Sequence, residues 1–459
     1  MKLFPIILAA GQGTRMNSSL PKVLHRIGGN PMLQHVVNSC EQLDIDNISI
    51  VYGHGGELVK EAIDNSKIKW VFQKDQKGTG HAVAQAKELM EDDAVIIIAY
   101  GDVPLIKSET LSLLASKLDN SVLSVLITKL DNPYGYGRIV RDDTGKILSI
   151  VEEKDATDEQ RQIQEVNTGF IAAKGIDLKR WLKQLEPNNK QGEYYLTDCI
   201  GLAVSEGGSV EAAVCNNPLE VQGVNNRIQQ AELERAYQLI KVKELMMAGV
   251  TLLDPDRVDI RGTIKAGKDV SIDVNTIFIG DVVLGDNVTV ESGCVIKNTQ
   301  IANNSVIQAN SVIDSAVIGV ACDIGPFARI RPDTILKDKS KVGNFVEIKK
   351  STVGQGSKVS HLSYIGDTQM GDGVNIGAGT ITCNYDGVNK FQTVIGDNVF
   401  VGSDTQLVAP VNLAQDTVIG AGSTITKDTP EGELTLSRSK QITIKGWNRP
   451  TKNTNKENS

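Results

Sequence analysis

Residues 318–347 read IGVACD IGPFAR IRPDTI LKDKSK VGNFVE, and an aliphatic residue returns at every sixth position. The same spacing, with an occasional interval of five, recurs over much of residues 284–425. Hexapeptide repeats predict a parallel β-helix, in which each side of a triangular coil takes about six residues and turns its aliphatic side chain inward. The aliphatic positions are Leu284, Val290, Ile296, Ile301, Ile307, Ile313, Ile318, Ile324, Ile330, Leu336, Val342, Ile348, Ile365, Ile376, Ile395, Val401, Leu407, Leu413, Ile419 and Ile425.

The period is interrupted in two places, where we expect loops to leave the coils. One interruption is GTITCNYDGVNKFQT at residues 379–393, and the other is VSHLSY at residues 359–364. Insertions in repeat proteins often lie on the binding face. The two interruptions therefore indicate where a site in this half of the chain is to be sought.

The composition fits a chain that is partly a solenoid. There are 43 glycines among 459 residues, and aromatic residues make up only 4%, because stacked coils have many tight turns and little room for large rings. The length predicts two to three domains. No apolar run is long enough to cross a membrane, so we predict no membrane association.

The charge and the cysteines argue against further classes of protein. The net charge is −8, whereas a nucleic-acid-binding surface usually makes a protein basic, so we predict no nucleic-acid partner. The six cysteines lie far apart without a CxxC pair, which argues against a disulfide framework or a zinc site. Reduced thiols predict a cytoplasmic location.

Residues 3–224 follow a different pattern, in which short apolar runs alternate with amphipathic stretches. This order is typical of βαβ units and predicts a Rossmann-like α/β domain with a mostly parallel sheet. Ligands of such sheets bind at the carboxyl ends of strands, so the loops after the first and fourth strands are candidate sites. The expected strands are residues 5–9, 48–52, 70–72 and 94–99, and the expected helices are residues 32–43, 79–90 and 110–118.

A long helix is predicted for residues 225–247, between the two patterns. We interpret it as a linker helix, and the alternative is a further helix of the first domain. Its expected apolar side consists of Ile228, Leu233, Ala236, Leu239, Ile240, Val242 and Leu245. The predicted parts are a first domain (1–226), the linker helix (227–249), the β-helix domain (250–445) and a polar, disordered tail (446–459).

The loop after the first strand reads LAAGQGTRM at residues 8–16 and is followed by a Pro-Lys pair. It has neither the third glycine of a dinucleotide-binding loop nor the GK[ST] of a P-loop. Gly11 and Gly13 still let backbone N–H groups approach an anion, and Arg15 and Lys22 supply charge for a triphosphate. A plain glycine turn is the alternative interpretation.

The fourth strand ends in YGDVPLI, so Asp102 leaves a buried strand at its carboxyl end. A carboxylate in that position needs a cation, which makes Asp102 a candidate Mg²⁺ ligand, with a helix N-cap or turn as the alternative. QKGTGHA at residues 76–82 adds a second glycine turn that opens a helix. The backbone of such a turn suits a base or a phosphate.

Together these residues resemble the sugar-1-phosphate nucleotidyltransferases, whose first-strand loop is AAGxGTRM followed by PK. With the hexapeptide half, the chain to about Pro450 resembles the family of bacterial bifunctional N-acetylglucosamine-1-phosphate uridylyltransferases and glucosamine-1-phosphate acetyltransferases. The further motifs that carry the resemblance are YGYGRI, EVNTGF, GEYYLTD, GVNNR, GPFARIRP, GNFVEIKK, HLSYIGD, NIGAGTITCNYDG and FVGSDTQLVAPV.

The resemblance implies an α/β nucleotidyltransferase domain, a linker helix and a left-handed parallel β-helix. It implies that glucosamine 1-phosphate is acetylated by acetyl-CoA on the β-helix, and that the α/β domain then transfers UMP from UTP to the product with Mg²⁺. The product is UDP-N-acetylglucosamine. A homotrimer is also implied, because the flat sides of such β-helices pack threefold in the resembling family.

For the first domain the resemblance also implies residue roles. The metal ligands would be Asp102 and Asn225, and the acetylated sugar would contact Gly137, Glu152, Asn167 and Asn225. The uridine nucleotide would contact Leu8, Ala9, Ala10, Gly11, Arg15, Lys22, Gln73, Gly78, Thr79, Tyr100, Gly101 and Asp102.

Residues 329–350 are basic within an acidic protein, with seven Lys or Arg against three Asp or Glu and a net charge of +4. Such a run is usually a solvated face, yet on stacked coils its side chains can align into an anion cradle. By resemblance, the glucosamine phosphate would contact Arg331, Lys349, Tyr364 and Asn375. Acetyl-CoA would contact Ala378, Asn384, Tyr385, Ser403, Ala421 and Arg438, with Asn384 and Tyr385 on the inserted loop.

His361 is the candidate catalytic base of the second domain. It lies in one of the two interruptions, among the residues expected to bind the sugar. Acetyl transfer needs an amine that has lost its proton, and imidazole exchanges protons near neutral pH. The alternative is a structural histidine.

Two other functions are open at this point. In one, the chain is a nucleotidyltransferase whose β-helix serves only oligomerisation or regulation, but such a solenoid has no reason to keep His361, Arg331 and Lys349. In the other, the chain is a non-enzymatic binding solenoid with a degenerate first domain, which predicts flat, Thr-rich faces without interruptions.

Overall fold

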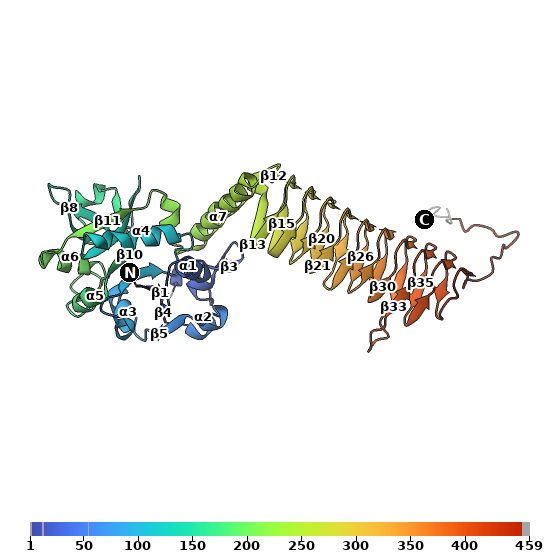
Figure 1. The fold of residues 1–459 in the computed structure, drawn as a ribbon, viewed down its shortest axis with the longest axis horizontal. Helices are drawn as coiled ribbons and strands as arrows, with labels where there is room; N and C mark the ends of the chain where they lie inside the picture. The colour runs from blue at the N-terminus through green and yellow to red at the C-terminus, as the bar shows by residue number, and fades with distance from the viewer. Residues whose placement is uncertain (1, 12, 54, 452–459) are drawn as a thin grey trace, which may run out of the picture. The chain divides into compact units, whose positions relative to one another are not determined.

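The computed structural model describes residues 2–11, 13–53 and 55–451 (Figure 1). The chain divides into two compact units. Unit 1 comprises the residues through Leu245 together with Val258–Thr263, and unit 2 comprises Met246–Arg257 and the chain from Ile264 onward. Each unit buries its own set of apolar side chains.

Unit 1 is built on a mixed sheet whose strand order is β11-β7-β10-β6-β1-β4-β5, with β8 paired to β10 and β9 paired to β8. Strands β6, β1, β4 and β5 are parallel, whereas β10 runs antiparallel to β6 and β7. The predicted mostly parallel α/β sheet is confirmed. The strands are β1 (Leu3–Ala9), β4 (Ile48–Tyr52), β5 (Ile68–Phe72), β6 (Val95–Tyr100), β7 (Leu123–Lys129), β8 (Arg138–Arg141), β9 (Ile147–Val151), β10 (Glu165–Lys174) and β11 (Val210–Val214).

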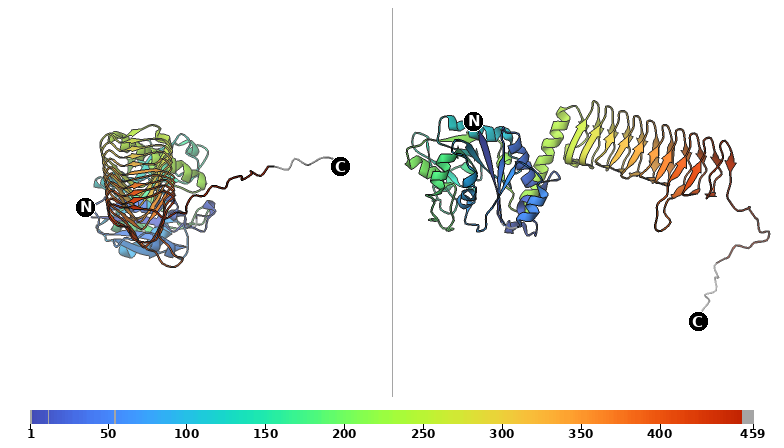
Figure 2. Two further views of the ribbon diagram at one scale, coloured as in Figure 1. Left: turned by 90° about the vertical axis from the view of Figure 1, so that its right-hand side faces the viewer. Right: turned by 60° about the horizontal axis from the view of Figure 1, so that its bottom comes forward.

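Helices flank this sheet (Figure 2), and one apolar core lies on each of its faces. The residues of β1 and β4 point alternately into the two cores, so both strands read as continuous apolar runs. The helix expected at residues 79–90 is wrong at its end, because α3 stops at Gln85 and a short 3₁₀ turn follows at Lys87–Leu89. The helices are α1 (Met32–Glu41), α2 (Gly56–Ala62), α3 (Thr79–Gln85), α4 (Ser108–Ser116), α5 (Gly175–Leu182) and α6 (Asp198–Ser205), and a small ribbon consists of β2 (Arg26–Ile27) and β3 (Asn30–Pro31).

The long helix α7 (Arg227–Met247) is present as predicted, but its buried side is different. The side chains of Ile228 and Leu239 are 71% and 42% exposed. Leu233, Val242 and Leu245 are buried as predicted. The buried side also includes Tyr237, which packs with Leu233 in a core cluster of unit 1, and Gln238, which exchanges hydrogen bonds with the backbone of Ile260 at 2.7 and 2.9 Å. A polar Gln is buried here because the neighbouring backbone satisfies it, which a hydrophobic pattern cannot reveal. The linker helix α7 is therefore also anchored to unit 1.

Unit 2 is a parallel β-helix, as predicted. Residues on neighbouring coils that hydrogen-bond lie 17 or 18 positions apart, which equals three hexapeptides less an occasional residue. All the predicted aliphatic positions are buried, at no more than 3% exposure. Among the described residues no helix is long and apolar enough to span a membrane.

The coils stack into two ladders. One is an 11-stranded ladder of β12 (Thr251–Leu252), β14 (Ser271–Ile272), β16 (Thr289–Val290), β19 (Val306–Ile307), β22 (Asp323–Ile324), β25 (Lys341–Asn344), β28 (Lys358–His361), β31 (Asn375–Ile376), β34 (Phe400–Val401), β37 (Val418–Ile419) and β39 (Leu434–Thr435). The other covers two sides and contains the end of β13 (Val258–Ala266, in unit 2 from Ile264 onward), β15 (Thr276–Leu284), β17 (Val295–Lys297), β18 (Gln300–Ile301), β20 (Val312–Asp314), β21 (Ala316–Ile318), β23 (Arg329–Ile330), β24 (Thr334–Leu336), β26 (Glu347–Lys349), β27 (Thr352–Val353), β29 (Tyr364–Gly366), β30 (Thr368–Met370), β32 (Ile381–Cys383), β33 (Thr393–Ile395), β35 (Gln406–Val408), β36 (Val411–Leu413) and β38 (Thr424–Ile425).

One of the two predicted interruptions is wrong. Val359 pairs with Val342 on the previous coil and with Ile376 on the next, so no loop leaves the helix at residues 359–364. The six-residue period is hard to see here because two steps take only five residues, from Ile348 to Val353 and from Ile365 to Met370. Val353 and Met370 are both buried, so they occupy inward positions of the coils. Residues 359–364 are an ordinary part of a coil.

The other interruption is confirmed. The Asp372 backbone N–H donates to Asp397 Oδ1 on the next coil. These two residues are 25 positions apart, whereas partners on other neighbouring coils are 17 or 18 apart. The extra residues form a loop between β32 and β33 that protrudes from the stacked coils, with a bridge between Tyr385 and Lys390 (Figures 1 and 2). Of the predicted tail, residues 446–451 are exposed and carry no helix or strand, and residues 452–459 lie outside the described residues.

Candidate functional site

A cleft of about 360 Å³ lies at the carboxyl ends of β1 and β6 in unit 1. Most of the residues predicted for nucleotide binding line it, although they come from segments far apart in the sequence. These residues are Leu8, Ala9, Ala10, Gly11, Lys22, Gln73, Gly78, Thr79, Tyr100 and Asp102. Four other lining residues were not predicted, Val23, Gln76, Ala82 and Glu193. Gln76 could have been predicted, because it is the first residue of the QKGTGHA motif.

Four polar side chains meet at one end of this cleft. The Lys22 ammonium donates to Asp102 Oδ2 and, at 3.2 Å, to Asn225 Oδ1, while the Arg15 guanidinium donates to the same Asn225 oxygen at 3.0 Å. The side chains of Lys22 and Asp102 are only 14% and 17% exposed. The residues predicted to contact phosphates and metal thus form one cluster, although Arg15 and Asn225 are 210 positions apart. Gly101 is buried beside the cluster, against Leu33 and Val23.

Two glycines are needed for the shape of the cleft. Gly13 has a φ of +62°, and a Cβ there would lie 2.7 Å from Cβ of Lys22. Gly78 has a φ of +105°, and its Cβ would lie 2.6 Å from the Tyr194 carbonyl oxygen. Both conformations favour glycine. The first loop can therefore lie against the Lys22 side chain and the second against the Tyr194 backbone, and Gly78 leads directly into α3.

The inner wall of the cleft has polar groups that are already paired. The buried Gln73 amide lies 2.9 Å from His81 Nδ1, and the Gln76 amide donates to the carbonyl oxygen of Ala10. Thr79 Oγ1 accepts a hydrogen bond from the Leu196 amide at 3.1 Å. Gln76 is therefore held against the first-strand loop, while His81 and Thr79 of α3 are joined to Gln73 and Leu196.

The residues predicted to bind the sugar form a neighbouring group. The Asn167 backbone N–H donates to the Gly137 carbonyl at 2.9 Å, and a Cβ on Gly137 would lie 3.3 Å from the Glu152 carboxylate. Burial raises the pKa of Glu152, and burial, with a smaller effect of the Glu152 and Asp102 charges, also raises the pKa of Tyr100. A partly desolvated carboxylate beside a glycine suits hydroxyl groups of a sugar. Asn225, also predicted to contact the sugar, lies in the cluster with Arg15 and Lys22.

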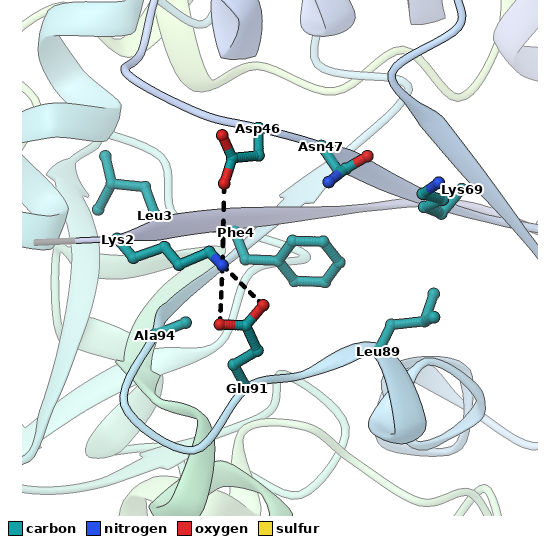
Figure 3. A pocket seen from close by; sticks show the side chains of 9 residues that line it. All are labelled: Lys2, Leu3, Phe4, Asp46, Asn47, Lys69, Leu89, Glu91 and Ala94. Carbon is teal, nitrogen blue, oxygen red and sulfur yellow. Dashed lines mark hydrogen bonds and ion pairs between the residues drawn. The ribbon is translucent and has the colours of Figure 1, made fainter.

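A second, smaller cavity of about 100 Å³ lies at the opposite edge of the sheet, at the amino ends of β1 and β6 (Figure 3). The Lys2 ammonium there contacts both Glu91 oxygens at 2.7 and 2.8 Å and Asp46 at 3.8 Å. Ligands of parallel sheets bind at the other edge. This cavity is therefore not part of the site.

In unit 2, His361 is exposed at the end of β28, and its Nδ1 lies 2.9 Å from Asn344 Oδ1 on the preceding coil. Asn344 was missed, because only coil stacking brings it beside His361. Arg331 donates to Glu347 Oε1 at 2.8 Å, and Glu347 lies beside Tyr364 in the ladder. The predicted basic and aromatic residues thus occupy successive coils.

A second group lies around Asp367. The ammonium groups of Lys349 and Lys350 are each 3.8 Å from its carboxylate, and the Asn384 amide donates to Asp367 Oδ2 at 2.5 Å. A Cβ on Gly366 would lie 2.4 Å from the Tyr364 hydroxyl and 2.9 Å from the Asn384 amide nitrogen. Lys349, Tyr364 and Asn384 are therefore brought together, as the resemblance implied.

The remaining predicted residues extend along the coils. Ala378 and Ser403 accept equivalent backbone hydrogen bonds at 2.8 Å from the next coil, and Arg438 Nη1 donates to the Ala421 carbonyl at 3.1 Å. This places the three carbonyl groups on one corner of successive coils. Asn375 lies in β31, and Tyr385 is 59% exposed on the protruding loop.

The fold and the two groups of residues define the class, a nucleotidyltransferase-type α/β domain joined to a hexapeptide-repeat transferase domain. The MobA-like NTP transferase domain family matches residues 5–161, the GMPPB C-terminal domain family matches residues 260–344, and the six-repeat bacterial transferase hexapeptide family matches residues 392–427. The chain is 55% identical over 450 residues to the bifunctional protein GlmU of Marinobacter nauticus, covering 98% of this chain and 99% of the relative.

The bifunctional protein GlmU of Methylococcus capsulatus is 54% identical over 453 residues, covering 98% of both chains. The chain therefore belongs to the family of the bifunctional protein GlmU. The chain is 19% identical to the solved structure of UDP-glucose pyrophosphorylase complexed with UDP-glucose, with a TM-score of 0.44 over 52% of this chain and 98% of that one.

As a member of this family, the chain is a bifunctional uridylyltransferase and acetyltransferase of UDP-N-acetylglucosamine synthesis. Its substrates include UTP and acetyl-CoA. The two other functions left open by the sequence are wrong. A β-helix that serves only assembly, or a non-enzymatic solenoid, does not match relatives that share nearly the whole chain and are bifunctional.

Proposed function

We propose that unit 1 transfers the uridylyl group at the cleft and that unit 2 transfers the acetyl group around His361. The observation that carries the first assignment is the cluster of Arg15, Lys22, Asp102 and Asn225 at one end of the cleft. Two cations and an acidic group beside a glycine loop are suited to a nucleoside triphosphate. The nucleotide and sugar contacts are those predicted from the sequence.

In unit 1, Arg15 and Lys22 bind the phosphates of UTP, and the residues around Glu152 position N-acetylglucosamine 1-phosphate. A phosphate oxygen of the sugar phosphate forms a bond to the α-phosphorus in line, and the bond to the departing pyrophosphate breaks. The side chains neutralise the charge that develops on the phosphates. No protein nucleophile takes part.

Asp102 and Asn225 are the proposed Mg²⁺ ligands. The donor set fits, because a carboxylate oxygen and an amide oxygen both contact one cationic group, the Lys22 ammonium, and oxygen ligands are those that Mg²⁺ prefers. When bound, Mg²⁺ neutralises negative charge on the substrate phosphates.

In unit 2, His361 accepts a proton from the amino group of glucosamine 1-phosphate as the nitrogen forms a bond to the acetyl carbon. The carbon–sulfur bond of the thioester breaks, and coenzyme A leaves. When Nδ1 donates to Asn344 Oδ1, the lone pair on Nε2 is free to take the proton. Arg331 and Lys349, held by Glu347 and Asp367, bind the sugar phosphate.

We also propose a cytoplasmic homotrimer, with the acetyl site at the seams between subunits. The exposure of His361 on one coil surface supports a site that a second copy completes. Sedimentation at enzymatic concentrations is expected to show a trimer. A monomer that keeps full acetyl transfer would contradict the proposal that the acetyl site lies between subunits.

The two-site assignment is tested in the full chain with glucosamine 1-phosphate, acetyl-CoA, UTP and Mg²⁺ supplied together and the products identified by mass. Asp102→Asn is expected to accumulate N-acetylglucosamine 1-phosphate, and His361→Ala is expected to leave glucosamine 1-phosphate unchanged. If both variants stop at the same compound while folded, the assignment of one reaction to each unit is wrong.

A further inference from the structure

The Lys22 ammonium lies between the two side chains that we propose as metal ligands. It donates to Asp102 Oδ2 and to Asn225 Oδ1 at 3.2 Å, and both ion-pair partners are largely buried. Arg15 adds a second cationic group on the same Asn225 oxygen at 3.0 Å. The ligand oxygens are therefore occupied by the protein's own cations.

We propose that Lys22 is a gate for the metal site. Without nucleotide its ammonium takes the place of the divalent cation, and the metal binds Asp102 and Asn225 only after the phosphates of UTP have drawn Lys22 away. This inference rests on the proposed function, because it assumes that the two oxygens are metal ligands.

Electrostatics supports this order of events. A divalent cation placed beside the ammonium of Lys22 and the guanidinium of Arg15 is repelled by both, and in a partly buried site the repulsion is poorly screened. Leaving Asp102 without a cation is also unfavourable, because a carboxylate with little exposure needs a partner. An incoming triphosphate removes both problems, since it offers Lys22 another anion and adds negative charge beside the metal.

The geometry of Lys22 permits such a movement. The root of its side chain packs against Gly13, where a Cβ would lie only 2.7 Å from Cβ of Lys22, so the root is held by the loop. The outer part of the chain has rotatable bonds, and an ammonium binds as a point charge without fixed planar geometry. The ammonium can therefore exchange a carboxylate for a phosphate while the backbone stays in place.

The test measures binding of Mn²⁺, as a paramagnetic probe for the metal, to the full chain without nucleotide, using the electron paramagnetic resonance signal of free Mn²⁺. Lys22→Gln is expected to bind Mn²⁺ more tightly than the unsubstituted protein by about 5–150-fold, the usual range of coupling between sites. Lys22→Arg keeps the positive charge and is expected to show no gain. Lys87→Gln removes an exposed lysine far along the chain and controls for net charge.

The double variant Lys22→Gln/Asp102→Asn separates the two hypotheses. If the gate and the metal site are correct, the double variant loses the affinity gained by Lys22→Gln. If Lys22→Gln gains no affinity, the gate is overturned while the metal assignment stands on the Asp102→Asn assay. If the double variant keeps the gain, the new Mn²⁺ site is not at Asp102 and the proposed metal ligands are wrong.

Discussion

The two sites of this protein are assembled in opposite ways. In unit 1 the cluster joins Arg15 to Asn225 across 210 positions and lies in a cleft where Lys22 and Asp102 are mostly buried. In unit 2 His361 and Asn344 are 17 positions apart, one coil from each other, on an exposed surface. A folded sheet encloses its site within one chain, whereas a solenoid can only display residues along a surface. We therefore expect a substitution in one site to abolish its reaction without affecting the reaction at the other site.

The largest effect is expected for Asp102→Asn. The substitution removes the carboxylate that Lys22 contacts and that we assign to the metal, so uridylyl transfer should fall below detection. Acetyl transfer should stay near normal, because Asp102 lies in unit 1 only. The two reactions are assayed separately on purified, folded protein, and loss of both would contradict independent sites.

His361→Ala is expected to lower acetyl transfer by about a hundredfold to ten-thousandfold, the usual effect of removing a general base. The KM for glucosamine 1-phosphate should change little, because Arg331 and Lys349 still bind the phosphate. Uridylyl transfer serves as the control and should survive. If turnover is kept and only acetyl-CoA affinity is lost, His361 is a binding residue.

Asn344→Ala is expected to have a smaller effect on the same reaction, about tenfold, which corresponds to one hydrogen bond of about 1.4 kcal/mol. The hydrogen bond to His361 Nδ1 orients the ring, so kcat and its pH profile should change more than KM. Asn344→Asp, which also accepts a hydrogen bond, should retain more activity than Asn344→Ala. Equal loss in both variants would count against a positioning role.

Truncation sharpens the boundary between the two units. A fragment ending near residue 250 should be a folded uridylyltransferase without acetyl transfer. A fragment ending at Thr263 should melt several degrees higher, because it keeps the two hydrogen bonds between the buried Gln238 and Ile260. Thermal unfolding followed by circular dichroism measures the difference. Identical melting temperatures would show that residues 258–263 add nothing to unit 1.

The smallest effect is expected for Glu152→Gln. Burial raises the pKa of Glu152 in the folded protein, so its ionised form is disfavoured there, and stability is lost as the pH rises above the unfolded value near 4.3. The glutamine should therefore raise the melting temperature of unit 1 at pH 7 by about 2 °C. Near pH 3.5 the gain should vanish, because the glutamate is then protonated in both states. A gain that is independent of pH would point to a cause other than ionisation.

Much of the fold was predictable because its signals are local. A β-helix places one aliphatic residue at nearly every sixth position, and all the positions chosen from that period are buried. The period failed at residues 359–364, where the five-residue steps to Val353 and Met370 imitated an interruption. For α7 the hydrophobic pattern correctly chose Leu233, Val242 and Leu245. It also chose Ile228 and Leu239, which are exposed, because the buried side is decided by what α7 packs against.

The sequence by itself determined the two architectures and the motif residues of both sites, because aliphatic periods and glycine loops depend on neighbours within a few positions. Only the tertiary structure decided which side chains touch. It placed Lys22 between Asp102 and Asn225, set Asn344 beside His361 and added Glu193 to the cleft. Such contacts join residues that no local pattern relates, since strand order and coil stacking bring them together only after the backbone has folded.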